Sequence, residues 1–242
     1  MHAACGYGCD EHYEHWRSDP VAKLGGAWYI LDVPFELQLT ELAYAYGTRR
    51  IFRDLTLTLR AGEALVVAGA NGSGKSTLLR LICGLQRPDS GMVRLYANGQ
   101  LLRPEDAPWL IGWVAPDLQL YRELTALENL DFFASVRGLR RSRTELEQLL
   151  DDVGLGGRGS DLLAAYSSGM AQRLRYAYAL LHTPPLLLLD EPTVTLDHQG
   201  VAIVERLVAR QRNRGVVIVA TNDPREERFG DYIVRLGVAG AA

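Results

Sequence analysis

Apolar residues follow two patterns along this chain, and each pattern predicts a different kind of strand. At residues 35–39 and 55–59 apolar positions alternate with polar ones, which is typical of antiparallel strands with one face in water. Residues 64–68 and 186–189 are continuous apolar runs, which indicate strands buried on both faces of a parallel sheet. Further strands are expected at 92–96, 111–114, 215–220 and 232–236.

Helical periodicity separates these strands. Two capping boxes, Thr125 with Glu128 and Ser142 with Glu145, open two helices that form a helical insertion at about 118–165. Strands that alternate with helices after a phosphate-binding loop indicate the α/β class. We therefore predict a mostly parallel sheet core with an antiparallel β subdomain and a helical insertion. Other helices are expected after residue 74, after residue 169 and at 200–212.

Three connecting segments carry signals of their own. Asn98-Gly99 is a strong signal for a two-residue hairpin. Tyr44 and Tyr46, followed by Gly47, are expected on a turn, where packing is the ordinary role of such rings. The basic run at residues 137–143 joins the two insertion helices. We expect a solvated link there, and contact with a partner or with anionic headgroups is the alternative.

The composition is that of a globular protein. The chain has 242 residues, 48% of them hydrophobic, which is enough for a sizeable core. The 26 Lys and Arg residues nearly balance the 29 Asp and Glu residues, so no general attraction to nucleic acid is expected. No apolar run approaches the roughly 20 residues that span a bilayer, and the start lacks the pattern of a signal peptide. These features favour a cytoplasmic location.

Residues 1–36 differ from the rest, and we expect a flexible N-terminal extension or a translation start placed too early. Cys5, Cys9, His12 and His15 lie close together there, and two thiols with two imidazoles could form a tetrahedral zinc site. Their spacing is too compact for the usual finger, so the prediction favours an extension without metal. Residues 37–242 are expected to form the folded domain.

Residues 69–77 fit the phosphate-binding pattern G-x-x-x-x-G-K-[ST], and they lie between a predicted strand and a predicted helix. The glycines allow successive N–H groups to point inward, and the helix N-terminus adds partial positive charge. Lys75 is expected to reach the β- and γ-phosphates of a nucleotide, and the Ser76 hydroxyl to bind Mg²⁺. The predicted nucleotide-binding residues of this loop are Gly69, Asn71, Gly72, Ser73, Gly74, Lys75, Ser76 and Thr77.

Two carboxylates, Asp190 and Glu191, follow the apolar run at 186–189. This order places them at the carboxyl end of a buried strand, next to the expected position of the phosphate-binding loop. Asp190 is predicted to hold Mg²⁺, directly or through water, while Glu191 orients and deprotonates the attacking water. Lys75 and Glu191 are therefore the candidate catalytic residues.

Residues 166–170, Tyr-Ser-Ser-Gly-Met, resemble the signature motif of ATP-binding-cassette (ABC) ATPases. Taken alone, this segment could be a helix N-cap formed by Ser167 or Ser168. The resemblance covers about residues 37–237 and implies a P-loop NTPase of ABC type that binds ATP and Mg²⁺. It also implies that Asp190 and Glu191 form the Walker B pair, that Tyr46 stacks on adenine and that Asp197 lies in the D-loop.

The same resemblance implies partners. Cassettes of this family sandwich two ATP molecules head to tail, so a single set of motifs implies a dimer, expected as a homodimer. Ser167, Ser168 and Gly169 would then reach the nucleotide bound by the other copy. A cassette carries no spanning helices, so an integral membrane permease is expected in trans, docked at the helical insertion and the groove near Pro116. The chain would lie on the inner face of the cell membrane.

Two positions depart from the family pattern. Pro116 stands where the Q-loop glutamine is expected, and Asn222 stands where the switch histidine is expected. Proline offers no side-chain oxygen, and asparagine cannot supply the charge of an imidazolium. Gln119 could substitute for the missing glutamine. We therefore expect slow hydrolysis through Glu191, and the alternative is a weakly hydrolysing regulatory or structural dimer.

Two short runs bear on the role within the family. Residues 124–133 and 196–201 are most similar to the ATPase subunit of the haem exporter used in cytochrome c biogenesis. This similarity implies haem export as the transport function. The cargo itself is contacted by the permease, so this chain carries no signal for it.

Overall fold

The protein is described from a computed structural model that covers residues 21–24, 27–30 and 34–237. The chain divides into two compact units, Met1–Val33 and Pro34–Ala242. The first unit contains an antiparallel pair formed by β1 (Val21–Leu24) and β2 (Ala27–Ile30). The second unit carries every motif discussed above apart from the cysteine and histidine cluster.

Among the described residues, no group of three or more His, Cys, Asp or Glu side chains is arranged to hold a metal ion. In the same part of the chain, no helix is both long and apolar enough to cross a membrane. The candidate zinc ligands lie outside the described residues, so the expectation for them stays a prediction: Cys5, Cys9, His12 and His15.

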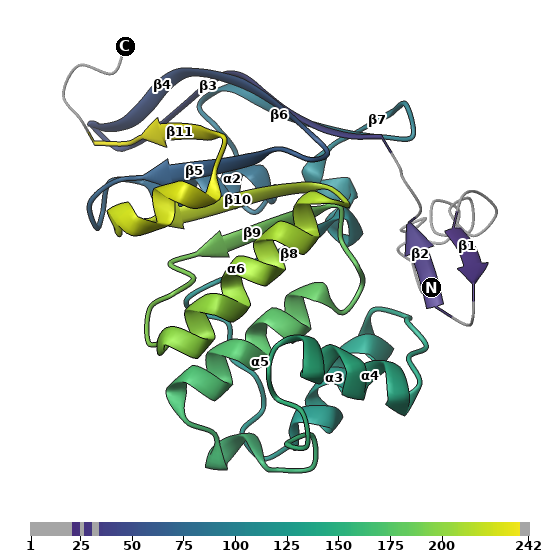
Figure 1. The fold of residues 1–242 in the computed structure, drawn as a ribbon. Helices are drawn as coiled ribbons and strands as arrows, with labels where there is room; N and C mark the ends of the chain where they lie inside the picture. Colours follow the sequence, from purple (N-terminus) through teal and green to yellow (C-terminus); the bar gives the residue numbers. More distant parts are fainter. Residues whose placement is uncertain (1–20, 25–26, 31–33, 238–242) are drawn as a thin grey trace, which may run out of the picture. The chain divides into compact units, whose positions relative to one another are not determined.

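The second unit combines two sheets with helices (Figure 1). The parallel sheet contains β5 (Ala64–Ala68), β8 (Ile111–Val114), β9 (Leu186–Asp190), β10 (Val216–Thr221) and β11 (Tyr232–Arg235). The antiparallel sheet contains β3 (Phe35–Tyr46), β4 (Arg49–Arg60), β6 (Ser90–Ala97) and β7 (Gln100–Leu102). The α-helices are α2 (Lys75–Ile82), α3 (Ala126–Val136), α4 (Arg143–Asp152), α5 (Ser168–Leu180) and α6 (His198–Arg212). Short 3-10 helices are η1 (Pro104–Asp106), η2 (Pro108–Leu110), η3 (Leu163–Ala165) and η4 (Pro224–Phe229).

The parallel sheet has the strand order β11-β5-β10-β9-β8. Every residue of β9 and β10 is buried, and the same holds for β5. This confirms the double-sided burial that the continuous apolar runs predict. Ala220 pairs in register with Asp190, and Thr221 with Ala68, so the carboxyl ends of these strands meet at one edge of the sheet.

The antiparallel sheet has the order β4-β3-β6-β7. Leu37 and Leu39 of β3 are buried while their neighbours are half-buried, which confirms the alternating pattern. The predicted hairpin at Asn98-Gly99 joins β6 to β7, and both residues have positive φ, as a type I′ turn requires. The expectation of Tyr44 and Tyr46 on a turn is wrong: both belong to β3, and the turn follows them.

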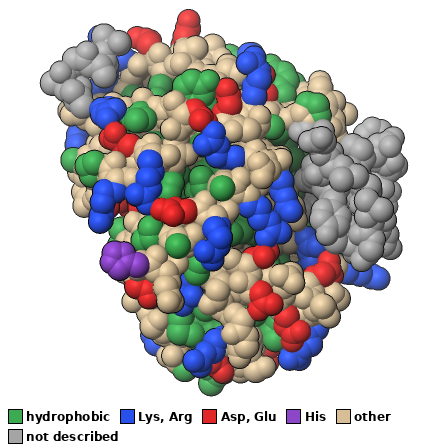
Figure 2. Space-filling view, in the orientation of Figure 1, with side chains coloured by type: hydrophobic (Ala, Val, Ile, Leu, Met, Phe, Trp, Pro, Cys, Tyr) green, Lys and Arg blue, Asp and Glu red, His purple; other side chains and the backbone are tan. Residues whose placement is uncertain are grey.

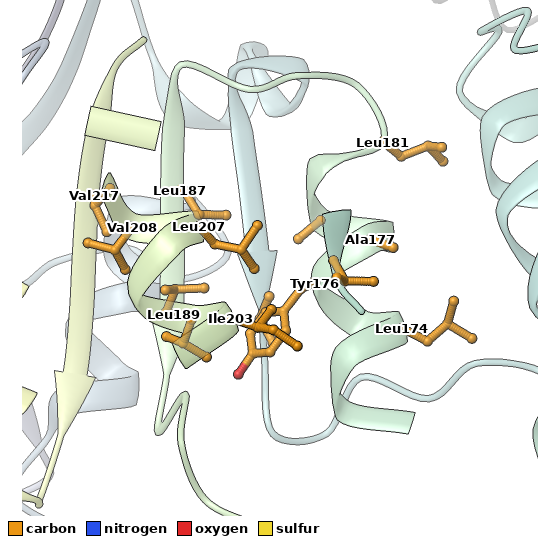
Figure 3. Close-up of a cluster of buried hydrophobic side chains, with 14 of the residues drawn as sticks. Leu174, Tyr176, Ala177, Leu181, Leu187, Leu189, Ile203, Leu207, Val208 and Val217 are labelled. Carbon is orange, nitrogen blue, oxygen red and sulfur yellow. The ribbon is translucent and has the colours of Figure 1, made fainter. Parts of the chain in front are cut away.

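The P-loop helix α2 touches both sheets. It packs against β9 and β10 of the parallel sheet, and Thr77 in its first turn meets Tyr46 of the antiparallel sheet. On the other side of the parallel sheet, α5 contacts β8 and α6 contacts β10 (Figure 1). Tyr176 of α5, Leu189 of β9 and Ile203 of α6 gather in the core that these elements share (Figure 3).

The two insertion helices begin as predicted. In α3 the Thr125 hydroxyl accepts from the Glu128 amide and the Glu128 carboxylate accepts from the Thr125 amide, and α4 repeats the box with Ser142 and Glu145. Asn129 is fully buried behind the first box. Its side chain accepts from the Tyr121 amide at 2.8 Å and donates to three backbone carbonyls, those of Tyr121, Leu124 and Thr125. One side chain therefore fixes the whole entry into α3.

The expectation of a solvated basic link at residues 137–143 is wrong for two of its four arginines. Arg137 contacts the His182 ring at 2.8 Å and lies over the Tyr178 ring. Arg141 donates to the Leu181 carbonyl at 2.9 Å, and only 11% of its side chain is exposed. Both cations cap carbonyls at the C-terminal end of α5, where a helix carries partial negative charge. Arg140 and Arg143 remain exposed.

The Asn129 network gives a stability prediction. Asn129→Ala leaves a fully buried site empty and removes hydrogen-bond partners from part-buried backbone groups, so we expect the free energy of unfolding to fall by about 2–3 kcal/mol. Glu128→Ala, one residue away, removes only part of an exposed cap and should cost about 1 kcal/mol or less. Urea unfolding followed by circular dichroism compares the two variants. Equal losses would contradict the role assigned to Asn129.

Candidate functional site

The phosphate-binding loop lies between the end of β5 and the start of α2. Gly72 and Gly74 have φ values of 76° and 107°, a left-handed region that favours glycine. A Cβ built on Gly74 would lie 2.0 Å from Cγ2 of Ile51, so only glycine fits against β4 there. The Gly69 amide donates to the Thr221 carbonyl at 3.1 Å. The loop is therefore fixed to β10 at one end and to β4 at the other.

Lys75 is the central charge of this site, and only 5% of it is exposed. Its Nζ donates to the carbonyls of Gly69 at 2.9 Å and Ala70 at 3.2 Å. It also forms an ion pair with Oε1 of Glu191 at 3.1 Å. A phosphate group in the loop would compete with Glu191 for this ammonium group. The structure thus brings together the two predicted catalytic residues.

Asp190 offers a cation site beside the loop. It is 2% exposed, and neither carboxyl oxygen has a hydrogen-bond partner of good geometry among the described residues. Burial raises the pKa of Asp190, while the nearby Ser76 hydroxyl favours the charged form. Mg²⁺ takes one or two protein ligands and completes its shell with phosphate oxygens and water. A buried carboxylate next to a hydroxyl fits that donor set.

Glu191 and Asn222 lie together at the mouth of the loop. Glu191 has a φ of 51°, its amide donates to the Ala220 carbonyl at 2.8 Å, and its Oε2 accepts from the Asn222 amide at 3.3 Å. The Asn222 side chain donates to Oδ1 of Asn71 in the loop at 2.9 Å. The position predicted for the switch residue is therefore in contact with both the phosphate-binding loop and the second carboxylate.

Tyr46 lies on the side of the loop next to α2. Its hydroxyl is 3.2 Å from Oγ1 of Thr77, and its ring meets Tyr44 edge to face at 4.9 Å. The hydrogen bond to Thr77 is the largest influence that lowers the pKa of the Tyr46 hydroxyl, and Gln86 adds to it. Tyr46 remains 48% exposed. The hydroxyl is thus anchored while about half of the residue is exposed to solvent.

The signature segment forms the start of α5. Ser167 caps the helix by accepting from the Met170 amide at 3.2 Å, and Ser168 is its first residue. A Cβ on Gly169 would lie 3.4 Å from the Thr195 carbonyl oxygen. Asp197 caps α6 through the Gly200 amide. Within the described part of the chain, none of these residues hydrogen-bonds to the phosphate-binding loop, so the predicted signature contacts are not made within one copy.

The segment after β8 contributes to a groove. Pro116 is exposed in a turn, and Leu118 donates to the Ala115 carbonyl at 3.2 Å. Gln119 lines a cavity of about 330 Å³ between this segment and α5. The remaining residues that line the groove are Leu120, Arg122, Leu163, Tyr166, Ala171 and Arg175.

Three contacts of the site carry no recognisable signal in the sequence. Arg49 of β4 donates to the Gly72 carbonyl at 2.9 Å, Gln86 donates to the Tyr44 hydroxyl, and the Thr221 carbonyl accepts from Gly69. Each contact joins segments that are more than 20 residues apart. Spacing rules describe neighbours along the chain, so they provide no way to find these partners.

Comparisons with known proteins agree with this geometry. Residues 52–194 match the family model described as ABC transporter. The chain is 34% identical over 195 residues to the linearmycin resistance ATP-binding protein LnrL of Bacillus subtilis (strain 168). It is 39% identical over 194 residues to the cytochrome c biogenesis ATP-binding export protein CcmA of Pseudomonas savastanoi. A solved structure of the ATP binding subunit of an ABC transporter superposes with a TM-score of 0.70 at 31% identity.

The extent of these matches differs. The overlap with LnrL takes in 79% of this chain but 62% of that protein, so the chain spans less than two thirds of this relative. The overlap with CcmA takes in 79% of this chain and 90% of that protein. The superposition covers 83% of this chain and 85% of the solved one. Since the family model matches more than half of the chain, the chain belongs to the ABC transporter family.

Proposed function

We propose that this chain binds and hydrolyses ATP to energise a separate membrane permease. The observation that carries the proposal is the contact of Lys75 with Glu191 at 3.1 Å, beside the buried carboxylate of Asp190. A phosphate-binding ammonium, a candidate general base and a cation ligand then surround one point at the carboxyl edge of the sheet. That arrangement suits transfer of a phosphoryl group to water.

The chemistry assigned to each residue follows from its position. Lys75 and the loop amides bind the β- and γ-phosphates, which releases Glu191 from its ion pair. Glu191 then orients a water molecule and accepts its proton as the water oxygen attacks the γ-phosphorus and the bond to the ADP oxygen breaks. Asp190 and Ser76 would hold Mg²⁺, which would neutralise phosphate charge. The Asn222 amide group can donate a neutral hydrogen bond to the γ-phosphate.

The remaining nucleotide contacts would come from Tyr46 of the same copy and from the signature segment of a second copy of the chain. Tyr46 would stack on adenine in one copy. Ser167, Ser168 and Gly169 of the other copy would meet the γ-phosphate, since the helix N-terminus that they form carries partial positive charge. Asp197 would lie at the same interface. The head-to-tail homodimer is supported by the separation of signature and loop within one chain.

The groove along Gln119 is the proposed docking site of the permease. It lies where the helical insertion joins the parallel sheet, and its lining combines apolar side chains with two arginines, Arg122 and Arg175. Acidic and basic side chains are interspersed on the face drawn in Figure 2, so this face offers no continuous basic surface for nucleic acid. A chain with these partners would lie on the inner face of the cell membrane.

Haem export for cytochrome c-type biogenesis is the proposed transport function. It is supported by 39% identity to CcmA over 90% of that protein's length. The similarity to LnrL, whose name refers to linearmycin resistance, keeps drug export as a competing cargo class. Identifying the membrane protein that co-purifies with the chain from native membranes decides between them.

A weakly hydrolysing regulatory dimer is the second candidate function. Pro116 and Asn222 favour it, because two side chains that normally attend the γ-phosphate are replaced. The intact pair of Lys75 and Glu191 opposes it. Steady-state ATPase assays with and without the permease separate the two candidates.

The first test concerns the general base. Glu191→Gln keeps the shape of the side chain but cannot accept a proton, so we expect turnover to fall by about 100-fold or more. ATP binding should persist, and the dimer should accumulate with ATP on size-exclusion chromatography. Glu147→Gln, on the exposed face of α4, is the matched control and should leave turnover unchanged. Turnover that survives in Glu191→Gln would contradict the proposed mechanism.

The second test concerns position 222. Asn222→His adds a side chain that can make a charge-assisted hydrogen bond to the γ-phosphate, and we expect turnover to rise several-fold. Asn222→Ala removes every side-chain hydrogen bond and should lower turnover. Identical rates in the two variants, measured by phosphate release, would show that this side chain does not limit hydrolysis.

The third test concerns the groove. Arg122→Glu reverses a charge in the groove lining, so we expect the permease to be lost from affinity purifications out of detergent-solubilised membranes. Arg140→Glu makes the same change at an exposed position in the link between α3 and α4, and this variant should still co-purify with the permease. If both variants still co-purify with the permease, the docking site lies elsewhere.

A further inference from the structure

The segment that follows Glu191 has an unusual backbone. Glu191 and Thr195 have φ values of 51° and 72°, a left-handed region that residues other than glycine rarely adopt. Thr195 is exposed, while Pro192 between them is buried. Such conformations persist where surrounding groups hold them in place. We call this segment the 191–197 loop. Its backbone conformation indicates that neighbouring residues hold it in place.

One anchor comes from α5. Tyr176 is 1% exposed, and its hydroxyl donates to the carbonyl of Pro192. Nε2 of Gln172, one turn earlier, lies 3.4 Å from the same hydroxyl. Burial raises the pKa of Tyr176, so the hydroxyl keeps its proton and stays a donor. Figure 3 shows the ring reaching from α5 toward Ile203 of α6.

A second anchor comes from η4. Glu226 is 3% exposed, and its Oε1 accepts from both the amide and the hydroxyl of Thr193, the amide at 3.2 Å. Its Oε2 has no hydrogen-bond partner of good geometry among the described residues. Burial raises the pKa of Glu226, and hydrogen bonds from Thr193 and Thr221 oppose that shift. Burial of a carboxyl group costs free energy unless hydrogen bonds compensate it, and Thr193 supplies two of them here.

The anchored loop connects two parts of the proposed machinery: the general base Glu191, and the signature segment that would serve the nucleotide of the other copy. At its start, Glu191 contacts Lys75 and the Asn222 amide. Near its end, the Thr195 carbonyl lies against Gly169 of the signature segment. A displacement of the loop would therefore move both the general base Glu191 and the Thr195 carbonyl that lies against Gly169.

We infer that Tyr176 and Glu226 are positioning residues that hold the 191–197 loop so that Glu191 meets its water and Gly169 keeps its place. This inference rests on the proposed hydrolytic role of Glu191. Both residues are buried, their hydrogen-bond partners Pro192 and Thr193 lie in the 191–197 loop, and neither residue belongs to the phosphate-binding loop. Loss of an anchor therefore slows the chemical step and leaves ATP affinity in place.

The test uses variants that remove one polar group each. Tyr176→Phe removes only the hydroxyl, and we expect kcat to fall by about tenfold with KM for ATP changed by less than about twofold. Glu226→Ala should have the same effect, whereas Glu226→Gln keeps an oxygen for Thr193 and should restore most of kcat. Tyr178→Phe is the control, because Tyr178 lies two residues further along α5 and packs on Phe133 and Arg137.

A second measurement follows the loop itself. Hydrogen exchange of the amides at residues 193–196 should be about tenfold faster in Tyr176→Phe and Glu226→Ala than in the wild type or Tyr178→Phe. Wild-type kcat in both anchor variants, or unchanged exchange in the loop, would overturn the inference. So would a fall in kcat that Tyr178→Phe shares or that follows the loss of thermal stability.

These outcomes are distinct from failure of the proposed function. If the wild type does not hydrolyse ATP, or if Glu191→Gln retains turnover, the proposed function fails. The inference about catalysis is then overturned with it. If hydrogen exchange in the loop is still faster in the two anchor variants, Tyr176 and Glu226 hold the loop in place but have no effect on catalysis.

Discussion

The structure around the site depends on the hydrogen bonds and the ion pair that compensate the buried charge of Lys75. A lysine whose side chain is only 6% exposed needs hydrogen-bond partners for its ammonium group. Two loop carbonyls and the Glu191 carboxylate meet that requirement. This geometry is possible only because the loop folds back on itself at Gly72 and Gly74, and because β10 lies between β5 and β9, so that the carboxyl ends of the three strands meet at one edge of the sheet. The sheet order therefore determines which carboxylate can reach the lysine.

Much of the fold follows from local signals. The hairpin at Asn98-Gly99 and the two capping boxes depend on residues at most three apart, so each could be located in advance. The buried strands were marked by their apolar runs, and the strand end at Asp190 placed the carboxylates correctly beside the loop. Extended segments such as β3, which continues through Tyr46, were less visible because polar and aromatic residues alternate irregularly near its end.

Other features depend on contacts between distant parts of the chain. Arg137 and Arg141 resemble solvated charges in sequence, and only the position of the α5 C-terminus shows that they cap its carbonyls. Tyr176 and Glu226 likewise look like ordinary helix residues. Their partners, Pro192 and Thr193, lie 16 and 33 residues away. No periodicity encodes such pairs, so the chemistry of the site could be predicted while its supporting contacts could not.

The replacement at position 222 can be interpreted in the same physical terms. The asparagine side chain is engaged with Asn71 of the phosphate-binding loop, and its backbone amide contacts Glu191. In both contacts the donor is an uncharged amide group of Asn222. These groups hold the loop and the carboxylate without adding positive charge near a γ-phosphate. Lys75 and the cation held by Asp190 would then supply the positive charge that stabilises the transition state within one copy. Hydrolysis at this site should accordingly be sensitive to the exact placement of Glu191, which is the residue that the buried contacts of Tyr176 and Glu226 support.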